Sequence, residues 1–328
     1  MDRNDATTFV SLLYQSILGR DADPEGLRLK VDALVNGRAS VVDITREFAQ
    51  SREFADRVRL TKPNLCGFPE FAPQDLFVAP DVLDALFAKT ATYWRNTAAK
   101  PDEMYWSVLT EGQWRRELTP DDRRRFVATG QPYAQRVLET HWKHSGRMPT
   151  NLRVLDFGCG VGRLALNFAP HVAEVCAVDF STAHLAELQK NAQLLNVGGK
   201  VSTWHLTTPA DLAPAPSVDL VYSFIALQHN TPPIIAHFVE SLLQHVLPGG
   251  YAFLHVTIAH AGYEGFAPQQ YLADPKAGTT MEVHFLPRKN LEQIARRAGC
   301  EIVESGCIGG TFCAYSEELV FRRPARSA

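Results

Sequence analysis

The chain has 328 residues, of which 45% are hydrophobic and 21% are charged. This composition is typical of a globular protein with a large hydrophobic core, and the length allows roughly two domains. The formal net charge is −3, so no global positive field favours nucleic acid or an anionic membrane surface. Small molecules or proteins are therefore the expected partners.

Six cysteines are scattered along the chain without a CxxC pair, and two of them lie inside apolar, strand-like runs. Reduced, buried thiols in a cytoplasmic protein show this pattern. The N-terminal stretch MDRNDATTFVSLLYQSILGR interrupts its apolar residues with polar ones, and nowhere do about 18 consecutive apolar residues occur. The sequence therefore predicts a cytoplasmic protein without a signal peptide or a membrane span.

Apolar residues recur at helical spacing three times in the first 50 positions. The three sets are Phe9, Leu12, Leu13 and Ile17; Leu27, Val31, Leu34 and Val35; and Val41, Ile44 and Phe48. Asp23 before Pro24 indicates a helix start, and Ser40 with Asp43 indicates a capping box. We therefore expect an all-helical accessory domain over residues 1–60.

The run LGRDADPEGLRLKVDAL, followed by SREF, resembles a small bacterial helical domain of unassigned function, known by an LGRxPDxxGL run and an SPEF ending. Ala22 and Arg52 stand where that pattern has proline. Proteins with this domain are often linked to extracellular polysaccharide and surface-glycan systems, so the resemblance implies a glycan context. The sequence leaves open whether residues 1–60 bind a protein or a glycan, dimerise, or do none of these.

Residues 61–150 are expected to form a linker followed by a helical, aromatic-rich segment. Prolines at 63, 69, 73 and 80 are typical of a linker over 61–80. Aromatic residues then concentrate at Tyr93, Trp94, Tyr105, Trp106 and Trp114. This aromatic cluster is either core or a lid over a substrate. A helix that starts at Thr119-Pro120 and another over 132–144 lead into the next strand.

From residue 152 onward, strand-like and helix-like segments alternate. The expected strands are 153–157, 174–179, 200–206, 219–224, 251–258, 301–307 and 318–323. The expected helices cover 162–169, 182–195, 233–247 and 288–298. Such alternation predicts an α/β domain over 151–328, Rossmann-like and doubly wound, with a mostly parallel seven-stranded sheet.

Three glycines at alternate positions follow the first strand, in the run RVLDFGCGVGR. Ligands bind at the carboxyl ends of strands in such sheets, and glycine there lets the backbone approach the ligand. A dinucleotide fingerprint would need glycine where the chain has Arg163. The spacing is instead GxGxG, preceded by Asp156, whose acid suits a cationic amino-acid ligand. Asp179, which ends the second strand, can accept hydrogen bonds from both hydroxyls of a ribose.

Four motifs, VLDFGCGVGRLA, AVDFS, DLVYSFIALQH and LLQHVLPGGYAFLHV, resemble those of class I S-adenosylmethionine-dependent methyltransferases in order and spacing. The resemblance implies that four residues cradle the methionine end of S-adenosylmethionine: Asp156, Gly158, Gly160 and Gly162. It also implies that Asp179 holds the ribose. The acid that binds adenine in this family is not evident, and Asp211 is the candidate for it.

Transfer of a methyl group from a sulfonium has a good leaving group, so alignment supplies much of the catalysis. An alcohol acceptor must also lose its proton, and histidine is the usual base near neutral pH. His229, just after the fourth strand, and His284, before the helix at 288–298, are the candidate catalytic residues, with a structural role as the alternative for each. By position, Ser223 is expected to line the cofactor site, and Gln228 to hydrogen-bond cofactor or substrate.

The sequence thus predicts O-methylation of a sugar, a glycan precursor or another small molecule, with S-adenosylmethionine as the cofactor and a histidine base. N-methylation of a small amine or amino sugar, and a non-catalytic cofactor-binding module, are the alternatives. Arg163 argues against a nicotinamide oxidoreductase. The SFIALQH loop lacks the Asn-Pro motif expected of a nucleic-acid methyltransferase. His141 and His144 have no obvious carboxylate partner, so no metal is expected.

Overall fold

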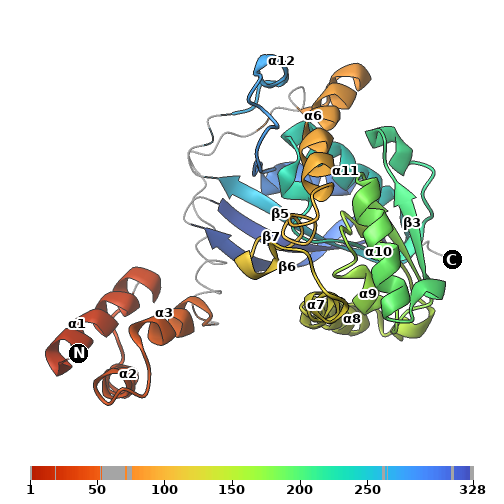
Figure 1. Cartoon of the computed structure of the whole chain (residues 1–328). Helices are drawn as coiled ribbons and strands as arrows, with labels where there is room; N and C mark the ends of the chain where they lie inside the picture. Colours follow the sequence, from red (N-terminus) through yellow and green to blue (C-terminus); the bar gives the residue numbers. More distant parts are fainter. Residues whose placement is uncertain are drawn as a thin grey trace. The chain divides into compact units, whose positions relative to one another are not determined.

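The computed structural model describes residues 2–18, 20–51, 53, 71, 76–260, 263, 265–311 and 314–325. The chain divides into two compact units, Met1–Gly67 and Phe68–Ala328, which are described separately (Figure 1). Most of the linker expected at 61–80 lies outside the described residues, as do Cys66 and Cys313.

Among its described residues the first unit has three α-helices, α1 (Arg3–Leu13), α2 (Pro24–Val35) and α3 (Val41–Ala49), and α1 continues into a π-helical turn. The expected caps are present, because the Asp23 carboxylate accepts from the Gly26 amide and Ser40 forms a capping box with Asp43. The apolar faces of these helices share a core of their own, although Leu12 is exposed. The expected N-terminal helical region is confirmed.

Seven strands of the second unit form one sheet in the order β3-β2-β1-β4-β5-β7-β6. The strands are β1 (Arg153–Phe157), β2 (Glu174–Asp179), β3 (Val201–His205), β4 (Val218–Ser223), β5 (Val246–His260), β6 (Glu301–Thr311) and β7 (Ala314–Arg322). The first five are parallel, and β7 runs antiparallel to its neighbours β5 and β6. The mostly parallel seven-stranded sheet is therefore confirmed.

Helices cover both faces of this sheet. They are α6 (Pro80–Ala98), α7 (Pro120–Ala128), α8 (Gln131–Ser145), α9 (Ala165–Phe168), α10 (Thr182–Leu194), α11 (Pro232–Gln244), α12 (Pro268–Ala273) and α13 (Arg288–Arg297). Successive strand residues point to opposite faces, so Leu155 joins the core under α6, α11 and α13, whereas Val154 joins the core under α7 to α10. Residues 80–150 thus pack on the sheet as part of the second unit.

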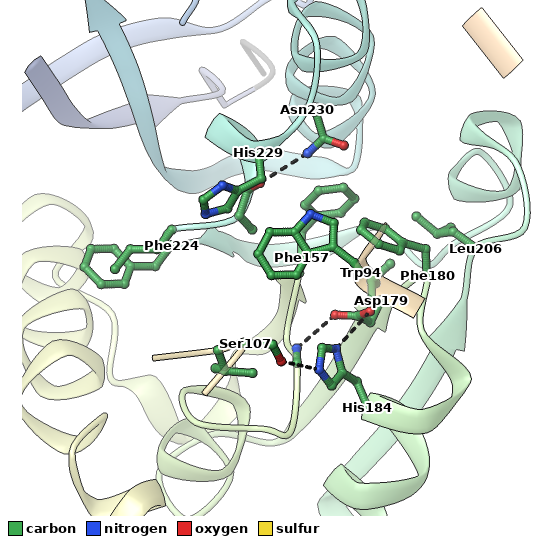
Figure 2. Close-up of a pocket in the computed structure, with 16 residues that line it drawn as sticks. Trp94, Ser107, Phe157, Asp179, Phe180, His184, Leu206, Phe224, His229 and Asn230 are labelled. Carbon is green, nitrogen blue, oxygen red and sulfur yellow. Dashed lines mark hydrogen bonds and ion pairs between the residues drawn. The ribbon is translucent and has the colours of Figure 1, made fainter. Parts of the chain in front are cut away.

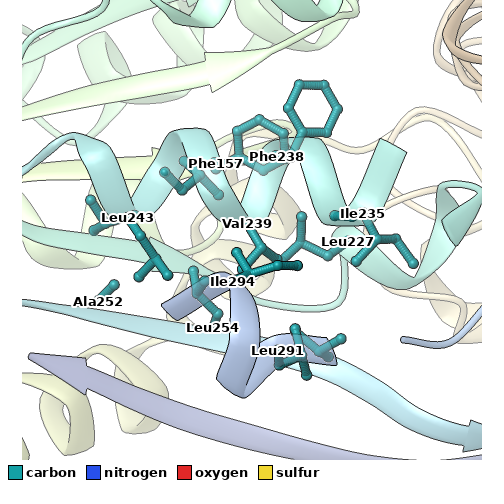
Figure 3. Packing of buried hydrophobic residues seen from close by; sticks show 14 of the residues in the cluster. Phe157, Leu227, Ile235, Phe238, Val239, Leu243, Ala252, Leu254, Leu291 and Ile294 are labelled. Atoms are coloured by element: carbon teal, nitrogen blue, oxygen red, sulfur yellow. The ribbon is translucent and has the colours of Figure 1, made fainter. Parts of the chain in front are cut away.

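The packing of α11 shows how one face is held. Phe238, Val239 and Leu243 of α11 lie among Leu254 of β5 and Ile294 of α13 (Figure 3). All five side chains are at most 1% exposed. Each such burial contributes about 1.5–3 kcal/mol before the entropy cost of folding is subtracted, so these contacts fix α11 and the loop in front of it.

The arrangement of strands also decides where a ligand can bind. Strand order reverses between β1 and β4, which are neighbours in the sheet although two strands separate them in the chain. In open α/β sheets the crevice at such a reversal, beyond the carboxyl ends of the strands, is the usual ligand site. In the described part of the chain, no helix has the length and apolar character that crossing a membrane requires.

Candidate active site

A pocket lies at the carboxyl ends of β1, β2 and β4, where small-molecule sites of such sheets are found (Figure 2). Its lining residues are Trp94, Ser107, Val108, Phe157, Gly158, Gly160, Val178, Asp179, Phe180, His184, Leu206, Phe224, Ile225, Ala226, His229 and Asn230. Figure 2 shows His229 at one end of the pocket and Asp179 and His184 at the other.

The loop after β1 requires its glycines. Gly158 and Gly160 line the pocket and have φ angles of 72° and 52°, in the left-handed region that favours glycine. A Cβ on Gly158 would lie 2.3 Å from the Ala226 Cβ, and one on Gly160 would lie 2.6 Å from Val108 Cγ2. Gly162 does not line the pocket, and a Cβ there would meet the core at Leu166. Two of the three glycines therefore line the pocket, and their role in binding a cofactor stays a prediction.

Asp179 lies in the pocket at the end of β2. Its Oδ2 accepts from the Gly160 amide at 3.0 Å, and its Oδ1 accepts from the Ser181 amide at 2.8 Å. An ionised carboxylate has about four lone-pair sites, so each oxygen can still accept a hydroxyl group. Its location therefore suits the role in ribose binding that the sequence predicts.

Three other predicted site residues lie outside the pocket lining. Asp156 and Ser223 are buried, and Asp156 Oδ2 and Ser223 Oγ have no hydrogen-bond partner. Burial raises the pKa of Asp156 to about 7. Asp211 Oδ2 instead accepts from the amides of Thr207 and Thr208. Contacts from Asp156, Ser223 and Asp211 to a cofactor remain predictions.

The structure brings three polar side chains to the pocket that the sequence analysis missed. Asn230 is 2% exposed, and its Nδ2 donates to the carbonyls of Ala226 and Leu227, while its Oδ1 has no partner. His184 Nε2 lies 2.9 Å from Ser107 Oγ. The position of His184 in the first turn of α10, directly after the AVDFS motif, could have indicated from the sequence that it lies near the pocket. Ser107 and Asn230 belong to no recognisable motif.

These features fit the cofactor that the resemblance implies. A side chain at Gly158 or Gly160 would collide with Ala226 or Val108, which line the pocket. The unpartnered Asn230 Oδ1 is a buried acceptor for an amino or hydroxyl group of a ligand. Trp94, Phe157 and Phe180 supply apolar and aromatic walls. Of the other aromatic residues expected as core or lid, Tyr105 and Trp114 belong to the core.

His229 is held in one tautomer. Its Nδ1 lies 2.9 Å from the backbone oxygen of Glu282, and a carbonyl oxygen can only accept, so Nδ1 carries the proton and Nε2 keeps its lone pair. The indole of Trp94 contacts the imidazole, with ring centroids 4.9 Å apart. Burial lowers the pKa of His229 to about 4, so the side chain is neutral at pH 7.

His284 is placed differently. Its Nδ1 lies 2.7 Å from the Tyr263 hydroxyl and its Nε2 lies 3.0 Å from Glu282 Oε2, and it does not line the pocket. Both ring nitrogens therefore have protein partners. The backbone amide of His284 donates to the carbonyl of Gln228, whose side chain is also outside the pocket lining. This geometry favours His284 as a support for Glu282 and the loop that carries His229.

Comparison with known proteins identifies two domains. A family model described as a methyltransferase domain matches residues 121–305, more than half of the chain, and a domain of unknown function, DUF4214, matches residues 3–58. The chain is 25% identical to trimethylguanosine synthase of Saccharomyces cerevisiae over 54% of this chain and 56% of that protein. It is 28% identical to the ubiquinone biosynthesis O-methyltransferase of Nitrosomonas europaea over 48% of this chain and 67% of that protein.

Two further similarities are partial. Phosphoethanolamine N-methyltransferase 3 of Arabidopsis thaliana is 30% identical over 33% of this chain and 22% of its own length. The chain thus spans about half or less of the first two curated relatives. Among solved structures, magnesium protoporphyrin IX methyltransferase from Synechocystis PCC 6803 with bound SAH aligns with a TM-score of 0.49 and 20% identity, over 71% of this chain and 99% of that one.

Proposed function

The chain belongs to the S-adenosylmethionine-dependent methyltransferase family, and from this premise we propose that it methylates a hydroxyl group of a small sugar or glycan precursor, with His229 as the general base. The observation that carries this proposal is the neutral imidazole of His229, which lines the pocket and donates its Nδ1 proton to the Glu282 carbonyl. The glycan context is supported by the sequence resemblance of the N-terminal domain.

The pocket residues have distinct roles in this proposal. When bound, S-adenosylmethionine supplies an electrophilic methyl group. Gly158 and Gly160 let the backbone approach the ligand, and Asp179 accepts hydrogen bonds from hydroxyl groups at the opposite end of the pocket from His229. The apolar walls from Trp94 and Phe157 exclude water, which strengthens each polar contact inside. Alignment by such a pocket can contribute about 7–11 kcal/mol to catalysis.

In this proposal His229 accepts the proton of the acceptor hydroxyl. Its Nε2 takes the proton of the hydroxyl as the oxygen attacks, and the bond from Nδ1–H to the Glu282 carbonyl holds the ring and stabilises the imidazolium that forms. A base in this position contributes roughly 10²–10⁴-fold to the rate. N-methylation of a small amine or amino sugar is the alternative from the sequence analysis. A neutral amine needs less help from a base, so loss of His229 would slow its methylation less.

The first test is calorimetric titration of the full chain with S-adenosylmethionine and with NAD, for the wild type and Asp179→Ala. We expect micromolar binding of S-adenosylmethionine alone, and its loss in Asp179→Ala, because both oxygens of Asp179 hold the loop and face the pocket. Asp121→Ala is the control, since Asp121 is 87% exposed on α7. Binding of NAD, or unchanged affinity in Asp179→Ala, would refute this assignment of the site.

A further inference from the structure

A second, small cavity shares Trp94 and His229 with the cofactor pocket. Its lining also includes Tyr93 of α6, and Tyr271 and Glu282 from the segment between β5 and α13. The space inside it admits about one water-sized group. An ammonium group is about this size, and the rest of a small acceptor would extend towards His229, which lines both cavities.

The cavity contains a carboxylate that is held in its ionised form. Glu282 Oε1 accepts from the Gly278 amide at 2.7 Å, and Oε2 accepts from the Tyr271 hydroxyl at 2.7 Å and lies 3.0 Å from His284 Nε2. Burial alone would raise the pKa of Glu282, but these hydrogen bonds outweigh it and lower the pKa to about 2. Because His229 is neutral, Glu282 is the single ionised side chain in the cavity lining.

Aromatic rings line the same cavity as this carboxylate. Tyr93 and Trp94 contact each other edge to face, with ring centroids 5.1 Å apart, and both line the cavity. The faces of such rings attract cations. The ring of Tyr271 already contacts a cation, because the Lys89 ammonium lies 5.6 Å from its centroid. This ammonium donates to the carbonyls of Tyr271 and Asp274. Lys89 is not in the cavity lining, whereas Tyr93 and Trp94 line it, and no arginine or lysine among the described residues lies over either ring.

We infer that Tyr93, Trp94, Tyr271 and Glu282 form an ammonium subsite, which binds the protonated amine of a small amino-alcohol acceptor whose hydroxyl lies at His229. This inference rests on the proposed function and narrows its substrate class. An ammonium group held by a carboxylate has no lone pair, so it anchors the acceptor and cannot attack the methyl group. The hydroxyl is then the nucleophile, and His229 Nε2 receives its proton.

The experiment compares two probes that differ only in the charged group, ethanolamine and ethylene glycol. Each is titrated into the full chain with saturating S-adenosylhomocysteine, and binding is followed by ligand-observed NMR. We expect the wild type to bind ethanolamine about tenfold more tightly, and Glu282→Gln to bind both probes equally. Glu292→Gln is the matched control, because Glu292 lies on α13 and is 43% exposed. Equal binding of both probes by the wild type would overturn the inference.

A second pair of variants covers the case in which Glu282→Gln disturbs the fold. Tyr93→Phe keeps the ring face and should keep the preference for ethanolamine, whereas Tyr93→Leu should lose most of it. If both variants keep the preference, the aromatic part of the subsite is wrong.

The dissociation constant of S-adenosylhomocysteine, measured in each sample, separates the two proposals. Unchanged cofactor affinity without a preference for ethanolamine refutes the ammonium subsite alone. Absence of cofactor binding refutes the proposed function, and the preference measured without cofactor then decides whether the cavity binds a cation.

Discussion

At the scale of single residues, the two candidate histidines differ in what their hydrogen bonds leave available. His229 lines the pocket, donates from Nδ1 to the Glu282 carbonyl and keeps a lone pair on Nε2, whereas His284 has protein partners at both nitrogens. A general base needs a free lone pair within reach of the substrate. His229 is therefore our candidate for the base, and His284 our candidate for a positioning residue.

Alanine substitutions test this assignment. We expect His229→Ala to lower kcat by roughly 10²–10⁴-fold with a hydroxyl acceptor, and His284→Ala to have a smaller effect that acts through Glu282. Turnover is measured by transfer of a labelled methyl group to acceptors from a screen of amino sugars and amino alcohols. Cofactor affinity within about twofold of the wild type is the control for folding. Turnover within about threefold in the double variant would rule out the general-base mechanism.

The pH dependence follows from the lowered pKa of His229. A base works in its unprotonated form, and burial lowers the pKa of this imidazole from 6.5 to about 4. Activity that depends on His229 should therefore be fully present above about pH 5 and be lost as pH falls through about 4. The measurement is kcat/KM between pH 4 and pH 8. An acidic limb centred near pH 6.5 would show that the imidazole is solvated in the working enzyme.

At the scale of elements, the loop after β1 joins the cofactor site to the segment between α6 and α7. Gly160 approaches Val108, its amide donates to Asp179, and Ser107 contacts His184 at the start of α10. Three elements thus meet at this point, where the absence of a side chain on Gly160 leaves room for the side chain of Val108. An added methyl group would push them apart.

Gly160→Ala tests this close approach. The φ of 52° costs an alanine about 1–2 kcal/mol, and its Cβ would lie 2.6 Å from Val108 Cγ2. We expect affinity for S-adenosylmethionine to fall at least about tenfold by calorimetry. The double variant with Val108→Ala should recover part of it, since the clash is relieved and the strain stays. Gly198→Ala, where nothing lies within 4 Å of the new Cβ, is the control. Wild-type affinity in Gly160→Ala would contradict this account.

At the scale of the whole molecule, the core is divided. One cluster of buried residues lies entirely within positions 6–48, and the clusters on the two faces of the sheet draw on positions 71–321. All lining residues of the cofactor pocket lie between positions 94 and 230, inside the second unit. Each unit therefore has its own source of hydrophobic stabilisation.

A fragment of residues 68–328 tests this division. We expect it to fold and to bind S-adenosylhomocysteine with a dissociation constant within about twofold of the full chain, because no lining residue is removed. Calorimetric titration and circular dichroism on both proteins provide the measurement. An insoluble fragment, or one with much weaker binding, would mean that the helical unit supports the site.

The sequence by itself determined the order of strands and helices, because apolar runs, glycines and helix caps act over a few residues and can be read locally. It also placed Asp179 and the glycines at strand ends, since their positions follow from the strands. Only the tertiary structure decided which histidine keeps a free lone pair, because the Glu282 carbonyl that holds His229 is 53 residues away in the chain. Trp94 lines one cavity with Asn230 and a second cavity with Glu282. Both cavities depend on packing between distant segments, which no local sequence pattern contains.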